Sequence, residues 1–470
     1  MGEMTVPSHV LYGATTQRAV MNFPISGRPV PMPVIQAFAR LKLACAEANR
    51  ELKRLPVKHT RLVTKACRLI IDACDGADTP LSQHGLVMEH FPVDVFQTGS
   101  GTSTNMNVNE VISNLACLAD GAKVGAKDPV HPNDHVNMGQ SSNDTFPTAM
   151  QVAAAVSIQT RLLPALRRLE RALAAKARRW DRIVKIGRTH LMDATPIRLG
   201  QEFSGYAAQA ALAQTRATAA MHALASNLPI GGTAVGTGIN THPKFGAMVA
   251  ARLKKQTKVP FAEADNHFEA QATRDCVVEA SGHLRTIAVS LSKIANDIRW
   301  LGSGPRCGLF ELSLPATQPG SSIMPGKVNP VICESIMQIT AQVAGNDQAI
   351  AIGGLGGVGS LLELNVAMPM MADNLCGSID LLANGSEMFV ERCIEDLEVN
   401  EAIATGTVER SLMMCTSLAP EIGYDNAAAV AKGAFKSGQT VREYVLEHGL
   451  VEAGRLDELL DARSMTAPQA

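Results

Sequence analysis

The chain has 470 residues, of which 46% are apolar and 19% are charged, as is typical of a globular protein with two or three domains. Its formal net charge of −1 gives no basis for a general attraction to nucleic acid or to an anionic membrane. Aromatic residues make up only 4%, so small and aliphatic side chains must fill the interior. This composition favours close helix packing over a sheet-rich fold.

Ten cysteines lie between Cys45 and Cys415, without a C-x-x-C pair or the spacing of metal ligands. We therefore expect reduced thiols, a cytoplasmic location and no bound metal. The first seven residues lack the basic and apolar segments of a signal peptide. The uncharged stretch 348–362 is only 15 residues long, too short to cross a bilayer, so we expect a soluble protein.

Residues 1–140 form the first predicted domain. Proline and glycine interrupt this section often, and helical runs are expected near 34–54 and 60–76. The first two of the four polar segments described below begin within it.

Residues 141–397 form the second predicted domain, which is dominated by long helices. Leucine and other apolar residues recur in steps of three and four over 162–184, which predicts one helix there. A second series alternates the same steps and predicts a helix packed nearly parallel to its neighbours: Val277, Ala280, Leu284, Ile287, Leu291, Ile294 and Ile298.

Two more long helices are expected over 201–227 and 364–396. The first carries alanine on nearly every side, which is typical of a helix buried on several faces and points to packing between subunits. Residues 398–470 form the third predicted domain, which is small and helical. The expected fold is all-α, with three domains.

Two polar segments precede or open this helical middle section. The run Thr98–Asn107 combines hydroxyl side chains with glycine amides, which suits either a binding site for an oxyanion or a solvated turn. The second runs from His131-Pro132-Asn133-Asp134 to Asp144. Its Ser141, Ser142 and Asn143 suit either a helix cap or a binding role.

Two further polar segments follow. Gly187–Ala194 contains His190, and imidazole is suited to proton transfer near neutral pH, although a lone histidine is often structural. Gly320–Pro330 contains two glycines and two prolines, which define a loop, together with two serines, Lys327 and Asn329, and Glu334 follows as a helix begins. Such a concentration of hydroxyl, ammonium and amide groups makes a purely solvated loop a poor explanation.

Together the four segments resemble the fumarase/aspartase superfamily, and Gly320–Pro330 resembles its signature sequence. The resemblance extends from Leu11 to Asp425 and is strongest to class II fumarases. His190, His131 and Gly326 are similar to fumarases, whereas aspartases tend to carry Gln, Asn and Ala at these positions.

The resemblance implies a homotetramer with a core of central helices, and active sites each built from three subunits. It implies a small dicarboxylate substrate, fumarate or malate, and a role in the tricarboxylic acid cycle without metal or organic cofactor. It assigns catalytic roles to His190, Ser321, Lys327 and Glu334. It assigns substrate binding to Ser100, Gly101, Thr102, Ser141, Ser142, Asn143, Thr189, Ser322, Lys327, Val328 and Asn329. A secondary anion site would use His131, Pro132, Asn133 and Asp134.

The implied reaction proceeds through a doubly charged aci-carboxylate, which Lys327 and Asn329 would stabilise. Ser321 matches the base, activated by loop amides and Lys327, and His190 matches the group that handles the departing water, oriented by Glu334. A role of His190 as the base stays open.

The chain departs from the family pattern near 353–365. Gly353–Gly357 is unusually rich in glycine, and Gly359–Asn365 replaces the usual Gly-Asn-Phe-Glu-Leu-Asn with one residue added. This change affects the expected substrate preference. A second departure, Asp128 just before the His131 segment, predicts a weak secondary anion site.

Within the same superfamily, two other functions compete with the hydratase. An aspartate ammonia-lyase is the nearer, and His190 argues against it. A non-catalytic structural tetramer would be expected to lose Ser321, His190 or Lys327, and all three are present. A dinucleotide enzyme is disfavoured because no G-x-G-x-x-G opens a βαβ unit.

Overall fold

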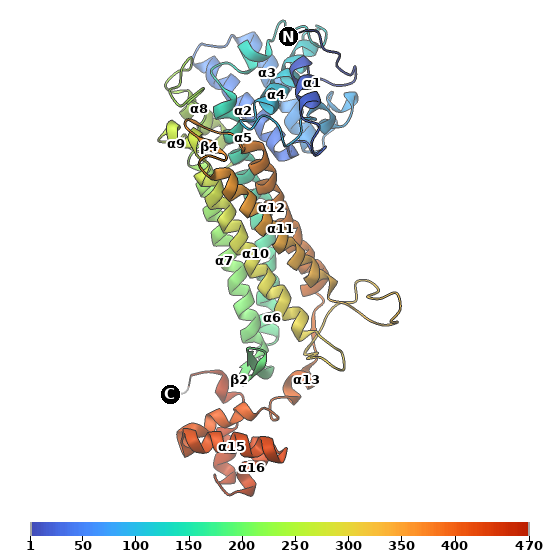
Figure 1. Ribbon diagram of the computed structural model, residues 1–470, viewed down its shortest axis with the longest axis vertical. Helices are drawn as coiled ribbons and strands as arrows, with labels where there is room; N and C mark the ends of the chain where they lie inside the picture. The colour runs from blue at the N-terminus through green and yellow to red at the C-terminus, as the bar shows by residue number, and fades with distance from the viewer. Residues whose placement is uncertain (1, 469–470) are drawn as a thin grey trace. The chain divides into compact units, whose positions relative to one another are not determined.

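The computed structural model describes residues 2–468 and divides into two compact units (Figure 1). Unit 1 comprises 1–164, 215–288 and 339–383, and unit 2 comprises 165–214, 289–338 and 384–470. The division passes through the long helices α7 (Leu199–Ala225), α10 (Asp275–Leu301), α11 (Val331–Gly354) and α12 (Met368–Phe389). The expected boundaries at 140 and 397 stay a prediction.

Unit 1 is almost entirely helical. Besides its parts of the four long helices it contains α1 (Ala14–Asn22), α2 (Met32–Glu51), α3 (Val57–Cys74), α4 (Thr102–Ala119), α5 (Ser142–Ser157), α8 (Phe245–Thr257), α9 (His267–Ala272) and the strand pair β4 (Ser360–Leu361) and β5 (Leu364–Asn365). Short helical turns occupy Ser82–His84, Val87–His90, Pro132–Val136 and Ile158–Leu162. The helical runs expected near 34–54 and 60–76 are confirmed as α2 and α3, each shifted by two or three residues.

Helix α2 lies at the centre of unit 1 and packs against α3, α5 and α8. Its Pro33 has a backbone fixed for the first helical turn, where its missing N–H is not needed. Most of its residues are buried, among them Val34, Phe38, Leu41 and, unusually, Lys42. A helix buried on so many sides fixes the positions of the helices around it.

Unit 2 contains α6 (Leu163–Arg179), the hairpin β1 (Val184–Thr189) and β2 (Met192–Arg198), the strand pair β3 (Leu312–Ser313) and β6 (Glu398–Val399), and the C-terminal helices α13 (Glu401–Gly406), α14 (Ala419–Ile422), α15 (Tyr424–Ser437), α16 (Val441–Glu447) and α17 (Ala453–Leu459). Short helical turns occupy Val390–Ile394, Leu412–Leu418 and Ser464–Thr466. The described residues form strands only in these short antiparallel pairs and in β4–β5, and the expected all-α class is confirmed.

The helix predicted over 162–184 is shorter in the structure than expected. Helix α6 stops at Arg179, and Val184 already begins β1. The chain turns back at this point because Gly200 N donates to Trp180 O at 3.1 Å. A Cβ at Gly200 would come within 2.4 Å of Ala177 O, so only glycine allows α7 to start so close to the end of α6.

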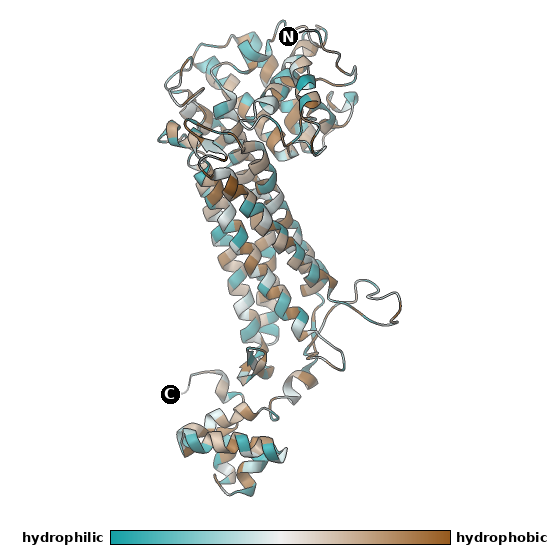
Figure 2. Ribbon diagram, viewed as in Figure 1, coloured by the Kyte–Doolittle hydropathy of each residue, from teal (hydrophilic) through white to brown (hydrophobic). Residues whose placement is uncertain are grey.

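The seam predicted on α10 is confirmed. Its seven apolar residues, from Val277 to Ile298, are each at most 2% exposed. Each buried aliphatic side chain of this kind stabilises the fold by roughly 1.5–3 kcal/mol. Figure 2 shows hydrophobic residues recurring along the long helices in the same way.

Helix α7 also forms as predicted, but in one chain it is not buried all round. Ala207, Ala210, Ala213, Ala217 and Ala220 are buried, whereas a second face with Ser204, Ala208, Ala211, Leu212 and Thr215 is exposed. Helix α12 begins at Met368 rather than 364, because Leu364 and Asn365 pair in β5. Within residues 2–468, no helix is both long and apolar enough to cross a membrane.

Candidate functional site

Three hydroxyl groups of unit 1 form a hydrogen-bonded chain, here called the hydroxyl cluster (Ser100, Thr102 and Ser142). Ser100 Oγ lies 2.9 Å from Thr102 Oγ1, which lies 2.7 Å from Ser142 Oγ. The two segments are forty residues apart in sequence, and the fold of unit 1 joins them. Gly101, Ser141 and Asn143 flank the cluster.

The hydroxyl cluster lies at the first turns of two helices, α4 and α5. Free N–H groups and the helix dipole make such positions favourable for an anion. Gly101 makes the close approach possible, because its φ is +71° and a Cβ there would come within 2.0 Å of the Phe146 ring. Two helix starts with hydroxyl side chains are suited to bind a carboxylate.

Ser141 is the N-cap of α5, which confirms the capping interpretation. Its Oγ accepts from Asn143 N, and Asp144 Oδ1 accepts from Ser141 N at 2.9 Å. Asp144 Oδ2 also accepts from Gly231 N and Thr233 N, at 3.1 and 3.0 Å. Burial raises the pKa of Asp144 to about 6 although these N–H groups oppose the shift.

Replacing Asp144 with Asn is expected to lower the free energy of unfolding by about 2–3 kcal/mol, because an amide N–H₂ would face backbone donors in a buried place. Thermal unfolding at matched protein concentration measures the effect. Asp134→Asn is the control, since the Asp134 side chain is 76% exposed and the expected change is below about 0.5 kcal/mol. Equal shifts in the two variants would contradict the assignment.

The sequence analysis missed the loop 229–241, which packs over the start of α5. Besides the bonds from Gly231 and Thr233 to Asp144, Asn143 Nδ2 donates to Ala234 O at 2.7 Å. Four glycines between 231 and 238 were the available signal. The loop therefore fixes the orientation of the Asn143 side chain beside the hydroxyl cluster.

The predicted secondary anion site forms one π-helical turn, Pro132–Val136, also in unit 1. His131 caps this turn, and its Nδ1 accepts from Asn133 N and Asp134 N at 3.3 and 3.2 Å. Pro132 is buried, and Asn133 and Asp134 are exposed. Nε2 of His131 can therefore contact a ligand. The negative charge of the Asp134 carboxylate, however, would repel an anion. The secondary anion site stays a prediction.

His190 lies in unit 2, at the tip of the β1–β2 hairpin that the sequence analysis did not predict. Thr189 pairs with Met192, which leaves His190 and Leu191 as a two-residue turn. Their φ angles are +58° and +61°, as in a type I′ turn, which strongly favours Asn and Gly. Both are exposed, so the chain accepts backbone strain to present an imidazole at a hairpin tip.

Leu191→Gly is expected to raise the free energy of unfolding by about 1 kcal/mol, because glycine adopts positive φ without steric cost. Thermal unfolding would show this as a higher midpoint. Leu446→Gly provides a matched control, since Leu446 is another exposed leucine of unit 2 but lies inside α16. There glycine should lower the free energy of unfolding by about 1 kcal/mol. Changes of the same sign in the two variants would contradict backbone strain at Leu191.

A buried ion-pair network holds the hairpin. Glu311 is 1% exposed and lies 2.9 Å from Lys185 Nζ and 2.7 Å from the Arg188 guanidinium, both on β1. Ile186, between them, belongs to the hydrophobic core formed by the C-terminal helices. The network borders a cavity of about 430 Å³ that His190 also lines, together with Glu202, Asp297 and Trp300.

The loop Gly320–Pro330 is closed at its base by its own hydrogen bonds. Gly320 N donates to Lys327 O at 3.0 Å, and Asn329 Nδ2 donates to Gly320 O at 2.7 Å. Ser321 Oγ accepts from Ile323 N and Met324 N, at 3.2 and 3.1 Å. Two N–H donors on one hydroxyl oxygen stabilise negative charge there, as a serine base requires.

The remaining predicted residues of unit 2 lie in or beside this loop and face solvent in one chain. Ser322, Lys327 and Val328 are exposed, as is Glu334 in the first turn of α11. No hydrogen bond or ion pair within residues 2–468 joins His190 to Glu334. The same residues hold no cluster of three or more His, Cys, Asp or Glu able to bind a metal ion.

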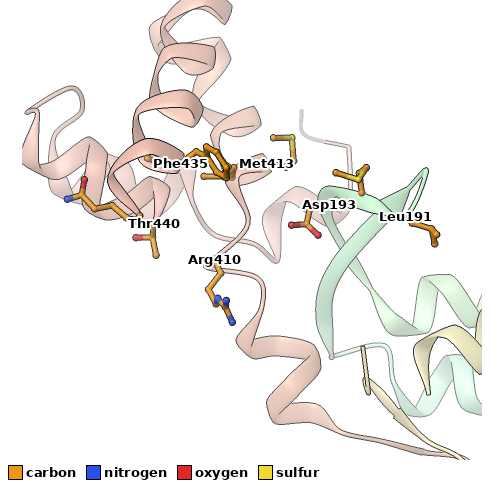
Figure 3. A pocket seen from close by; sticks show the side chains of 11 residues that line it. Leu191, Asp193, Arg410, Met413, Phe435 and Thr440 are labelled. Atoms are coloured by element: carbon orange, nitrogen blue, oxygen red, sulfur yellow. The ribbon is translucent and has the colours of Figure 1, made fainter. Parts of the chain in front are cut away.

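A second cavity, of about 830 Å³, lies between the hairpin and the C-terminal segment of unit 2 (Figure 3). Leu191 and Asp193 border it from the hairpin, and Arg410, Met413 and Phe435 border it from the C-terminal helices. None of the predicted site residues lines it. Leu191 of the hairpin tip lines both cavities, whereas His190 lines only the smaller one.

Residues 2–345 match the Lyase family, and residues 414–467 match the Fumarase C C-terminus family. The mitochondrial fumarate hydratase of Mus musculus is 49% identical over 100% of this chain and 89% of its own length. The class II fumarate hydratase of Corynebacterium glutamicum is 51% identical over 98% and 93%. The crystal structure of class II fumarase from Schistosoma mansoni superposes with a TM-score of 0.93 at 38% identity, covering 100% of this chain and 98% of that one. The chain belongs to the class II fumarate hydratase family, within the fumarase/aspartase superfamily.

Proposed function

We propose that this chain catalyses the reversible hydration of fumarate to L-malate, as a step of the tricarboxylic acid cycle. The observation that carries the proposal is similarity over nearly the whole chain, at 49–51% identity, to proteins named fumarate hydratase. The two helix starts at the hydroxyl cluster add a chemical reason, because they suit one carboxylate of a dicarboxylate.

In the malate-to-fumarate direction, the hydroxyl proton of Ser321 first passes to solvent. The Ser321 alkoxide then takes the proton from C3, and the adjacent carboxylate becomes an aci-carboxylate dianion. The N–H groups of Ile323 and Met324 stabilise the charge on Ser321 Oγ. Lys327 and Asn329 stabilise the dianion, a contribution that typically amounts to about 10²–10³ in rate for one donor. The C2–O bond then breaks, and hydroxide leaves as water with a proton from His190.

The remaining predicted residues bind or orient. Ser100, Gly101, Thr102, Ser141, Ser142 and Asn143 hold one carboxylate, and Thr189, Ser322 and Val328 complete the substrate contacts. Glu334 orients His190. Because no hydrogen bond or ion pair joins the two side chains within residues 2–468, we assign Glu334 to a neighbouring subunit. The segment His131–Asp134 is the secondary anion site. The reaction uses no metal and no organic cofactor.

We infer a homotetramer in which three subunits contribute to each active site. The exposed face of α7 supports this, since Ser204, Ala208, Ala211, Leu212 and Thr215 carry no charge. A large uncharged face of small residues suits close helix packing between subunits. Sedimentation should give about four times the 49.8 kDa chain mass, and a monomer would contradict the assembly.

The ten unpaired cysteines suit a reducing compartment, and we propose the cytoplasm.

The test of the activity is ultraviolet absorbance of fumarate formed by the purified protein, in the presence of a metal chelator. Fumarate should form from L-malate and not from L-aspartate. Formation from aspartate alone would identify an ammonia-lyase, and silence with both would favour the non-catalytic tetramer. Activity that the chelator abolishes would contradict the proposed independence from metal.

A further inference from the structure

Lys42 is a fully buried lysine of α2 without a carboxylate bonded to it. Its side chain is 0% exposed, and Nζ donates to Asn105 Oδ1, Asn137 Oδ1 and Gln140 Oε1, at 2.7, 2.9 and 3.0 Å. All three acceptors are neutral amide oxygens, so the hydrogen bonds satisfy the donors without neutralising the charge. A buried charge held this way costs stability, which indicates a purpose other than folding.

The bonded groups connect Lys42 to the hydroxyl cluster. Asn105 lies on α4 one turn after Thr102, and its Oδ1 also lies 3.1 Å from Thr145 Oγ1. Thr145 lies on α5 one turn after Ser142, and its Oγ1 donates to Ser141 O at 2.7 Å. The ammonium is therefore placed about one helical turn behind the two helix starts of the cluster.

Few charged groups face Lys42. Cys45 on α2 and Cys67 on α3 are thiols whose pKa values are raised by burial, to about 12 for Cys67, so both are neutral. Asp144 on α5 is the remaining group, and its oxygens are bonded to backbone N–H groups instead of Lys42. Without Lys42, a buried negative charge would stand beside the hydroxyl cluster and repel a carboxylate.

We propose that Lys42 is a positioning residue whose buried charge offsets Asp144 and so enables the hydroxyl cluster to bind a dianionic dicarboxylate. This inference rests on the proposed function and deepens it. It adds to the site a cation that does not touch the substrate.

The charge of Lys42 is sensitive to pH. Burial lowers its pKa to about 8, against the opposing influence of the Asp144 carboxylate. Lys42 is therefore charged below about pH 8 and loses its charge as the pH rises above that value. Affinity for a dicarboxylate should weaken in the same range.

The experiment measures binding of succinate, an unreactive dicarboxylate, by calorimetry at pH 7 and pH 9. At pH 7, Lys42→Met should raise the Kd about 10- to 50-fold, as expected for loss of a buried unit charge near the bound dianion. The wild type should bind more weakly at pH 9, and the variant should lack this change. Lys58→Met, which removes an exposed lysine of α3 paired with Asp120, should behave as wild type.

Lys42→Gln retains N–H donors for the amide oxygens and replaces the Met variant if that variant does not fold. An unchanged Kd in the Lys42 variant, or an alkaline weakening that persists in it, would overturn this inference alone, provided that the wild type hydrates fumarate. A wild type that neither hydrates fumarate nor binds succinate would overturn the proposed function first.

Discussion

Ser321→Asn is expected to lower kcat for malate dehydration by about 10²–10⁴, the contribution of a positioned acid or base. The physical reason is loss of the oxygen that carries the transferred proton. The Asn side-chain carbonyl can still accept the N–H groups of Ile323 and Met324, as Asn does in turns, so the loop keeps its shape. Initial rates of fumarate formation measure the loss.

Ser321→Ala is the matched variant for the loop itself, because it removes both the base and the acceptor of the two N–H groups. If Ser321 is the base, the Asn and Ala variants should be similarly inactive at saturating malate. An Asn variant that keeps nearly wild-type kcat would show that Ser321 only shapes the loop, and would move the base role to His190.

His190→Asn is expected to lower kcat by about 10²–10⁴ while leaving the fold intact. Asn is among the residues preferred at the first position of a type I′ turn, so the hairpin should be at least as stable as in the wild type. Loss of activity with an unchanged or higher unfolding midpoint would therefore show that His190 acts in the chemical step and not in folding.

Leu191→Asn is the control for this position, as it places the same side chain on the neighbouring residue of the turn. It should retain most of the activity. Equal losses of kcat in the two variants would show that activity depends on the shape of the hairpin tip in general. That result would contradict a proton-transfer role of His190.

The sequence predicted the long helices well because their signals are local and repeated. The apolar residues from Val277 to Ile298 recur in steps of three and four over many turns. They therefore lie on one face of the helix, and a neighbouring helix that buries one of them also buries the others. The N-cap at Ser141 was also readable, since Ser followed by Asp144 is a capping pattern.

The β1–β2 hairpin could not be predicted from the same rules. Its turn is His190-Leu191 rather than Asn-Gly, and its strands gain their stability from distant groups such as Glu311 and the core around Ile186. A short strand held mainly by tertiary contacts leaves little trace in its own sequence.

Part of the candidate site was hidden for a related reason. Lys42 lies in a helical run, where a lone lysine is ordinarily solvated, and only the fold brings Asn105, Asn137 and Gln140 around it. The pairing of Thr102 with Ser142 likewise depends on how α4 and α5 pack. Residue type indicated the chemistry of the hydroxyl cluster, and tertiary structure was needed for its geometry.

The central claim is that this chain adds water, and not ammonia, to fumarate. The most direct measurement supplies fumarate together with ammonium in D₂O and follows the products by proton NMR. We predict L-malate carrying a single deuterium at C3, formed as one stereoisomer, with no aspartate. Aspartate in place of malate, or fumarate left unchanged, would contradict the account.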